Sequence, residues 1–412
     1  MKTFAIKTLT ILITIMLELT MTGCAEKEPA KKTENPFEKD VQFLKKHAET
    51  LVLSDSTGQS RIAVVPDYQG RVMTSTAGGE NPQSFGWINY ELIEEGKTLQ
   101  HINPWGGEDR FWLGPEGGQY SLFFEPKTPY TLQYWQTPPV IDTEAYELVA
   151  SNTNTASFTK PARLINRAGT RFDVLIERTL SVLERQQAET KLQTDVPDSV
   201  RLICFQSENR LTNKGLPWRK QRGLLSIWIL GMFKSSPATT VVIPFEKGAV
   251  DQLGPKVNDE YFGKVPKERL AVKQDVLFFE ADGKFRSKIG VGPKRAKTIA
   301  GSYDAKNNTL TIIQYSKPRG AADYVNSLWK DQEKPYAGDV LNAYNDGPPE
   351  DSQKQLGLFY ELESSSPAKQ LNRDESISHT HRTFHLQGKK EQLDEIAQQI
   401  LGVTLDEIQN AL

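Results

Sequence analysis

Cysteine is scarce in this sequence, which has only Cys24 and Cys204 among 412 residues. Cys24 ends an N-terminal segment that we interpret below as a cleaved signal, so the folded part keeps one cysteine. A disulfide within the folded part is therefore excluded, and its stability has to come from a hydrophobic core. The content of 38% hydrophobic residues is that of a globular protein and not of a disordered one.

An excess of basic residues is also missing, because 50 Lys and Arg are balanced by 52 Asp and Glu. A nucleic-acid-binding protein would need a basic surplus or stripe to neutralise phosphates, so we expect no nucleic-acid partner. The sequence has no glycine-rich phosphate loop, no Gly-x-Ser-x-Gly elbow and no Cys-x-x-Cys pair. We therefore assign no cofactor and no metal ligand.

The longest apolar run lies at the N-terminus, where Lys2 and Lys7 precede the stretch from Leu9 to Leu19. This stretch is too short to span a bilayer comfortably and is typical of an export signal. The signal ends in Met-Thr-Gly-Cys at residues 21–24, which resembles the lipobox of bacterial lipoproteins. The resemblance implies that Cys24 is lipidated and anchors the protein in the cell envelope, in the periplasm or at the outer membrane. An ordinary secretory signal with a chance cysteine is the alternative.

The pattern divides the chain into four segments. We predict a signal peptide over residues 1–23, a charged tether over 24–40, one all-β domain over 41–388 and a helical extension over 389–412. Eleven runs of alternating or β-branched residues, separated by turn residues, occur from about residue 51 to 387. They predict a large antiparallel sandwich.

Short helices are predicted at three places. Pro36 favours a helix start before the sandwich, and residues 323–330 have the pattern of a short inserted helix. Near the C-terminus, apolar residues at helical spacing follow residue 390, and Thr404 with Glu407 forms a capping-box pattern. We expect these terminal helices to pack on the sandwich.

The segment 101–120 is rich in glycine, tryptophan and charged residues, which indicates a shaped loop. Aromatic faces beside amide, carboxylate and guanidinium groups suit a pyranose, whose C–H face stacks on rings while its hydroxyls take hydrogen bonds. In the alternative interpretation, these tryptophans fill the core and the charged residues form structural salt bridges. The residues of this segment do not decide between the two interpretations. The substrate-binding candidates here and on the strand before the loop are Arg71, Asn103, Trp105, Glu108, Asp109, Arg110, Trp112 and Glu116.

A second group of candidates lies near the C-terminus. On a strand, Glu361 and Glu363 point to the same face, and two carboxylates in one site raise one pKa into a range that suits proton transfer. Asn345, Asp346 and His381 are further substrate-binding candidates. The three histidines between residues 379 and 385 have a spacing that zinc sites on strands use, but a solvated edge strand is the preferred interpretation.

Taken together, the segments from Glu361 to Phe384 and from Pro104 to Glu116 resemble the galactose mutarotase (aldose 1-epimerase) family. The resemblance implies a β-supersandwich fold with short terminal helices, in which Glu361 or Glu363 is the general base. The family's acid is a histidine in a mid-chain strand, and residues 225–233 contain none, so the remaining acid candidate is His101.

The sequence thus predicts an envelope lipoprotein that binds or acts on a sugar or glycan, with epimerase- or mutarotase-type acid–base chemistry. A glycan-binding lipoprotein without catalysis, and a glycoside-cleaving or lyase enzyme, are the alternatives. The sequence leaves the sugar and the oligomeric state open.

Overall fold

The computed structural model describes residues 35–80, 82–348 and 355–412. The signal, Cys24 and most of the tether lie outside these residues. Within them, no helix is both long and apolar enough to cross a membrane.

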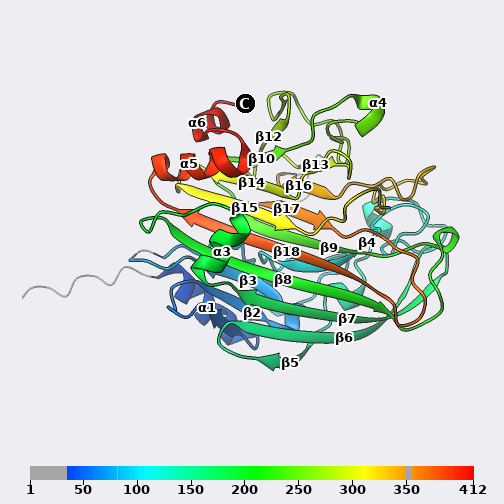
Figure 1. Cartoon of the computed structure of the whole chain (residues 1–412). Helices are drawn as coiled ribbons and strands as arrows, with labels where there is room; N and C mark the ends of the chain where they lie inside the picture. Colours follow the sequence, from blue (N-terminus) through cyan, green and yellow to red (C-terminus); the bar gives the residue numbers. More distant parts are fainter. Residues whose placement is uncertain (1–34, 81, 349–354) are drawn as a thin grey trace, which may run out of the picture. The chain divides into compact units, whose positions relative to one another are not determined.

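Three antiparallel sheets form the fold (Figure 1). The largest has ten strands, in the order β11 (Leu270–Val272), β12 (Val276–Glu280), β10 (Thr239–Pro244), β14 (Ile299–Asp304), β15 (Thr309–Tyr315), β18 (Ser376–Gln387), β8 (Arg201–Asn213), β7 (Arg171–Val182), β6 (Thr155–Ile165) and β5 (Glu147–Ser151). The second has the order β13 (Ser287–Val291), β16 (Leu341–Asn345), β17 (Phe359–Ser365), β9 (Ser226–Lys234) and β4 (Arg110–Gly114). The third joins β1 (Leu51–Ser54), β2 (Arg61–Val65) and β3 (Arg71–Thr76).

The five-stranded sheet packs one face against the ten-stranded sheet. Strand alternation supplies this face, because every second residue of β17 and β9, such as Leu362 and Ile229, points toward the partner sheet. These residues join two hydrophobic clusters with residues such as Ile176 and Ile313 of the large sheet. The all-β sandwich predicted from the sequence is confirmed.

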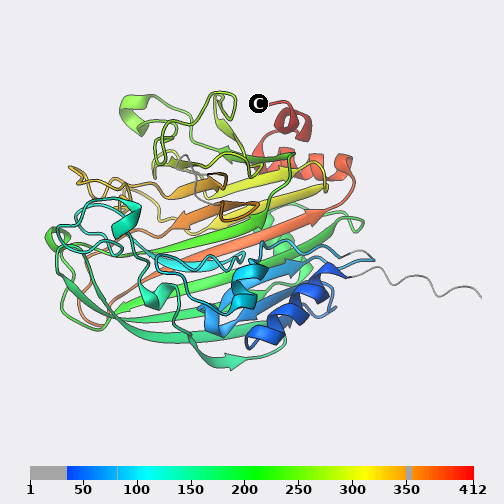
Figure 2. The same ribbon diagram turned by 180° about the vertical axis from the view of Figure 1, so that it is seen from behind.

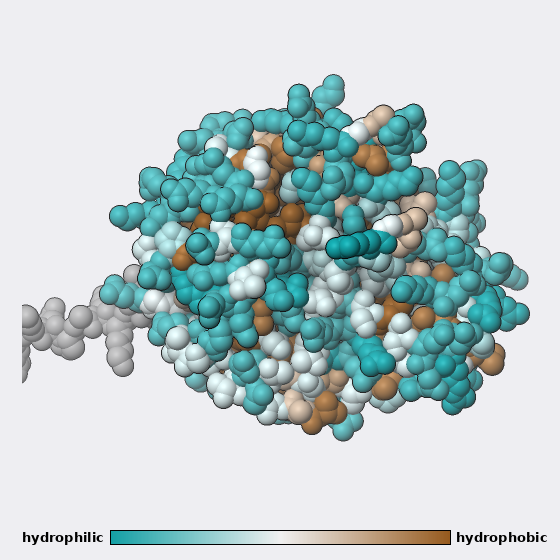
Figure 3. Space-filling view, in the orientation of Figure 1, coloured by the Kyte–Doolittle hydropathy of each residue, from teal (hydrophilic) through white to brown (hydrophobic). Residues whose placement is uncertain are grey.

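Five of the six α-helices in the described part of the chain cover the sheets. Figure 2 shows α1 (Pro36–His47) and α2 (Tyr90–Glu95) beside the three-stranded sheet, with which they share a hydrophobic cluster. The helices α3 (Arg185–Leu192), α5 (Lys390–Leu401) and α6 (Leu405–Gln409) pack on the outer face of the ten-stranded sheet, and α4 (Val250–Leu253) is one turn in a loop. In Figure 3, the hydrophobic residues visible on this side lie in small groups among hydrophilic ones.

The helix predictions were largely correct. Asn35 caps α1 by accepting a hydrogen bond from the Glu38 amide, and Thr404 and Glu407 form the predicted capping box of α6. We placed residues 36–40 in the tether, whereas α1 begins at Pro36 and buries Phe37 in the domain. The helix predicted over 323–330 is wrong: this stretch is a loop, in which the backbone of Tyr324 and Asn326 bonds to residues 335–338 instead of forming helical hydrogen bonds.

A buried ion pair links the two large sheets. Arg178 of β7 donates to the carboxylate of Asp109, which directly precedes β4, and neither side chain is exposed to solvent. Ser207 of β8 donates to the second carboxylate oxygen of Asp109 at 2.8 Å. Burying these two charges removes their hydration, which costs free energy. Each charge therefore depends on the opposite charge of its partner for stabilisation.

We expect Asp109→Asn to lower the free energy of unfolding by about 3 kcal/mol, since it leaves the Arg178 charge buried without a counter-charge. Urea unfolding of the full chain, followed by circular dichroism, measures this change. Glu177→Gln is the control: this carboxylate is exposed on the same strand as Arg178, so its loss should matter little. Equal stabilities of the two variants would contradict the prediction.

Candidate functional site

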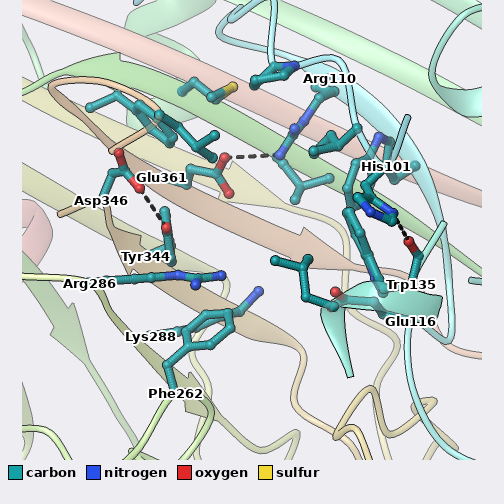
Figure 4. Close-up of a pocket in the computed structure, with 18 of the residues that line it drawn as sticks. His101, Arg110, Glu116, Trp135, Phe262, Arg286, Lys288, Tyr344, Asp346 and Glu361 are labelled. Atoms are coloured by element: carbon teal, nitrogen blue, oxygen red, sulfur yellow. Dashed lines mark hydrogen bonds and ion pairs between the residues drawn. The ribbon is translucent and has the colours of Figure 1, made fainter. Parts of the chain in front are cut away.

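The second face of the five-stranded sheet forms the floor of a cavity of about 310 Å³. Alternate residues of all five strands reach it, because the intervening residues point into the core between the sheets. Loops complete the wall, including residues 99–102 and 346–347. Figure 4 shows the charged side chains of this cavity, which come from segments far apart in the chain.

Aromatic rings make up much of the wall. Trp112 of β4 meets Trp228 of β9 edge to face at 5.5 Å, and Trp135 stacks on Trp329 at 5.9 Å between ring centroids. Phe262 joins them from a loop. Four of the seven tryptophans thus line one cavity, and their faces suit the C–H face of a sugar ring.

Glu361 is the carboxylate of the cavity floor. Its Oε1 accepts a hydrogen bond from Arg110 Nη2 at 2.9 Å, and both side chains are almost fully buried. Burial raises the pKa of Glu361 to about 7; Arg110 opposes this shift, and the charge of Glu363 adds to it. Glu361 is therefore present in both its protonated and its ionised form near neutral pH.

Glu363 lies two residues further along β17 and is completely buried. Its Oε2 accepts from Trp228 Nε1 and from Lys288 Nζ, both at 2.9 Å, while Oε1 has no partner among the described residues. Trp228 occupies the strand in which the mutarotase resemblance implies a histidine. Glu363 is thus held in place by a cation and an indole, and of the two glutamates of β17 it is Glu361 that lines the cavity.

Two further titratable side chains, His101 and Glu116, face the cavity (Figure 4). His101 Nδ1 lies 2.7 Å from the backbone oxygen of Trp135; since a carbonyl only accepts, Nδ1 carries the proton and Nε2 is free for other partners. Burial raises the pKa of Glu116, which Lys288 partly opposes. Glu116 therefore keeps its proton to a higher pH than a carboxyl group in water.

Asp346 closes another side of the cavity. Its Oδ1 accepts from the Tyr344 hydroxyl at 2.7 Å and its Oδ2 from the Gly357 amide at 2.8 Å. Arg286 lines the same side, and its guanidinium lies over the Phe262 ring at 4.3 Å.

Of the sequence candidates, His101, Arg110, Trp112, Glu116, Asp346 and Glu361 line the cavity, with Glu363 next to them. The structure places the others elsewhere. Asn103 bonds to Asp142 and to Leu99, and so shapes the loop that carries His101. Trp105 stacks on Tyr68 at 4.2 Å, with Arg71 over its ring.

The remaining candidates hold the interior together. Glu108 accepts from Ser75 and contacts His385 Nε2 at 2.7 Å, and Asp109 belongs to the ion pair with Arg178. Asn345 fixes the turn before β13 through Gly283 and Phe285, and His381 contacts Ser364.

The solvated edge strand inferred for the three C-terminal histidines is wrong. Their strand, β18, lies between β15 and β8, and His379, His381 and His385 are buried. Burial lowers the pKa of His379 and of His381 to about 3, so both are neutral at physiological pH. Among the described residues, no group of three or more His, Cys, Asp or Glu side chains is placed to hold a metal ion.

Sequence reasoning missed Lys288, Arg286, Phe262 and Trp329 as cavity residues. Strand β13 was absent from the predicted strands because its five residues contain a lysine and a glycine. Only the pairing of β13 with β16 brings Lys288 opposite Tyr344, and this pairing has no local signal in the sequence.

Residues 35–412 match a family described as a family of unknown function (DUF6786). The chain belongs to this family. The sequence matches none of the curated proteins with which it was compared.

Solved structures with a similar fold include two proteins from lactobacilli. One is a galactose mutarotase-like protein from Lactobacillus casei ATCC 334 (TM-score 0.45, 9% identity, covering 82% of this chain and 100% of the other). The other is a galactose mutarotase related enzyme from Lactobacillus acidophilus (TM-score 0.44, 8% identity, covering 82% and 97%). Both are described as galactose mutarotase-like or mutarotase-related, the family that the sequence resembles.

We expect the Glu361 carboxyl to titrate near pH 7 in carbon-13 NMR of the full chain, against 4.5 for an unperturbed glutamate. Glu363→Gln should lower this pKa, because it removes a nearby negative charge, and Arg110→Met should raise it, because it removes the positive one. The folded state favours the protonated form, so this group's contribution to stability is lost as the pH rises from about 4.5 through 7. A midpoint near 4.5 in the unmodified chain would refute the assignment.

Proposed function

We propose that the cavity binds a sugar or a short glycan and transfers protons on it, with Glu361 as the acid–base residue. The observation that carries the proposal is the near-neutral pKa of Glu361 on the floor of a cavity walled by tryptophans. A general acid–base catalyst works best when its pKa lies close to the working pH.

The shape of the cavity supports a sugar as the ligand. Its volume of about 310 Å³ is in the range of small-ligand sites, and flat rings alternate with carboxylate, guanidinium and ammonium groups. The rings would take the apolar face of a pyranose. The charged groups would take its hydroxyls through hydrogen bonds that are stronger than those between neutral partners.

Mutarotation is the reaction that this set of groups supports best. Ionised Glu361 would remove the proton of the anomeric hydroxyl as the bond between the anomeric carbon and the ring oxygen breaks. The ring oxygen would take a proton from Glu116, whose pKa is raised by burial, or from Nε2 of a protonated His101. Closure on the other face returns both protons, so the reaction needs no other reactant.

Binding without turnover is the second candidate. It is favoured by Trp228, which stands in the strand where the resemblance implies a catalytic histidine, and whose indole N–H bonds to Glu363. In that case the same groups would recognise the sugar without breaking its ring.

We expect Glu361→Gln to reduce catalysed anomeric exchange at least about 100-fold while the sugar still binds, because glutamine keeps the shape but cannot accept the proton. Exchange NMR with a panel of reducing sugars measures the rate, and line broadening in the same spectra measures binding. Glu177→Gln, remote and exposed, is the matched control.

The outcomes of this experiment separate the candidates. Exchange that persists in Glu361→Gln would refute the role of Glu361. Broadening without exchange in the unmodified protein would establish the binding function, and new products from glycans would point to cleavage. The absence of any response would reject a sugar ligand.

We also propose that the protein acts at the cell envelope, held by a lipid on Cys24. The support is the lipobox-like sequence at residues 21–24 and the charged stretch that follows it.

Cys24→Ser should move the protein from the membrane fraction to the soluble fraction of its host, because the thiol that carries the lipid is gone. Immunoblots of the separated fractions measure the distribution. Cys204→Ser, a change at a buried interior thiol, is the control for the loss of a cysteine. Membrane association that survives Cys24→Ser would refute the anchor.

A further inference from the structure

Two cations enter the cavity from the edge of its floor. Arg286 directly precedes the edge strand β13, and Lys288 is the second residue of that strand. Both line the cavity, and Figure 4 shows them near each other on the same side. Their spacing of two residues places them on one face of the chain, since side chains alternate along a strand.

Lys288 already has a counter-charge. Its Nζ donates to Glu363 Oε2 at 2.9 Å and lies over the Trp228 ring at 4.7 Å. An ammonium group has three N–H donors, so this pairing leaves donors for a ligand in the cavity. The charges of Lys288 and Glu363 cancel, and Lys288 acts toward the cavity mainly as a hydrogen-bond donor.

Arg286 is not paired in this way. Among the described residues, no carboxylate lies within ion-pair distance of its guanidinium, which lies over the ring of Phe262. The neighbouring acid, Asp346, is turned to other partners, because its two oxygens accept from Tyr344 and from Gly357. The Arg286 guanidinium therefore presents unused donors beside an aromatic face.

The other two cations of the cavity are paired with carboxylates. Arg110 pairs with Glu361, so these two groups compensate each other when both are ionised. Burial raises the pKa of Asp346, which the charge of Arg286 partly opposes, and it raises the pKa of Glu116 as well. Of the three cations that line the cavity, the Arg286 guanidinium is the one without an ion-pair partner among the described residues.

We propose that the sugar bound by this cavity carries a carboxylate, as a uronic acid does, and that this group binds between Arg286 and Lys288. This inference rests on the proposed function and narrows its substrate class. A carboxylate has one negative charge, and its two oxygens can accept two parallel hydrogen bonds from a guanidinium group. A phosphate monoester, with a charge of about −1.5 to −2 at pH 7, exceeds the single charge of the Arg286 guanidinium.

Calorimetric titration of the full chain with glucuronate and with glucose tests the proposal. We expect glucuronate to bind at least about tenfold more tightly, because a charge-assisted hydrogen bond in a desolvated site contributes that much. In Arg286→Gln, the ratio of the two dissociation constants should fall about tenfold. Arg163→Gln, at an exposed arginine of β6, is the matched control and should leave the ratio unchanged.

Each other outcome overturns the inference. If glucose binds as tightly as glucuronate, the cavity takes neutral sugars and only the proposed function stands. If Arg286→Gln weakens both sugars equally, the guanidinium supports the fold of the wall and does not select a carboxylate. If glucose 6-phosphate binds more tightly than glucuronate, the anionic group is a phosphate. If no sugar binds, the proposed function fails as well.

Discussion

The structure depends on one constraint, which is that the five-stranded sheet has a covered face and an open one. Packing against ten strands fixes the direction of every residue in β17, so that Leu362 enters the core while Glu361 and Glu363 must point the other way. A shift of one residue in pairing would bury both glutamates among apolar residues. Because burying two carboxyl groups among apolar residues costs free energy, this register of β17 is favoured, and the register fixes the positions of the acidic groups.

Burial also sets the chemistry of these groups. Removing a carboxylate from water favours its protonated form, and the neighbouring cations oppose this effect to different extents. Glu361, with Arg110 at 2.9 Å and Glu363 nearby, has a pKa of about 7, whereas the interior carboxylate of Asp109 pairs with Arg178 and Ser207. A carboxylate thus supports the fold at one position and has a pKa suited to proton transfer at another.

What the sequence allowed us to predict was local. Alternation within one segment identified the strands and placed Glu361 and Glu363 on one face, and capping patterns located the terminal helices. It could not show that Arg110 meets Glu361 across 251 residues of sequence, or that Lys288 meets Glu363 across 75. The residues of the 101–120 loop looked alike in the sequence, but some line the cavity and others fill the interior. Only tertiary packing determines which of these residues line the cavity and which lie in the interior.

Because Trp112, Trp135, Trp228 and Trp329 line one cavity, the intrinsic tryptophan fluorescence of the protein is sensitive to what binds there. More than half of its indoles surround a single space, and one of them donates a hydrogen bond to a buried carboxylate. Emission from the unlabelled protein therefore reports mostly on what occupies that space and on the charge beside it. A library of compounds can therefore be screened for binding by tryptophan fluorescence, before any reaction is known.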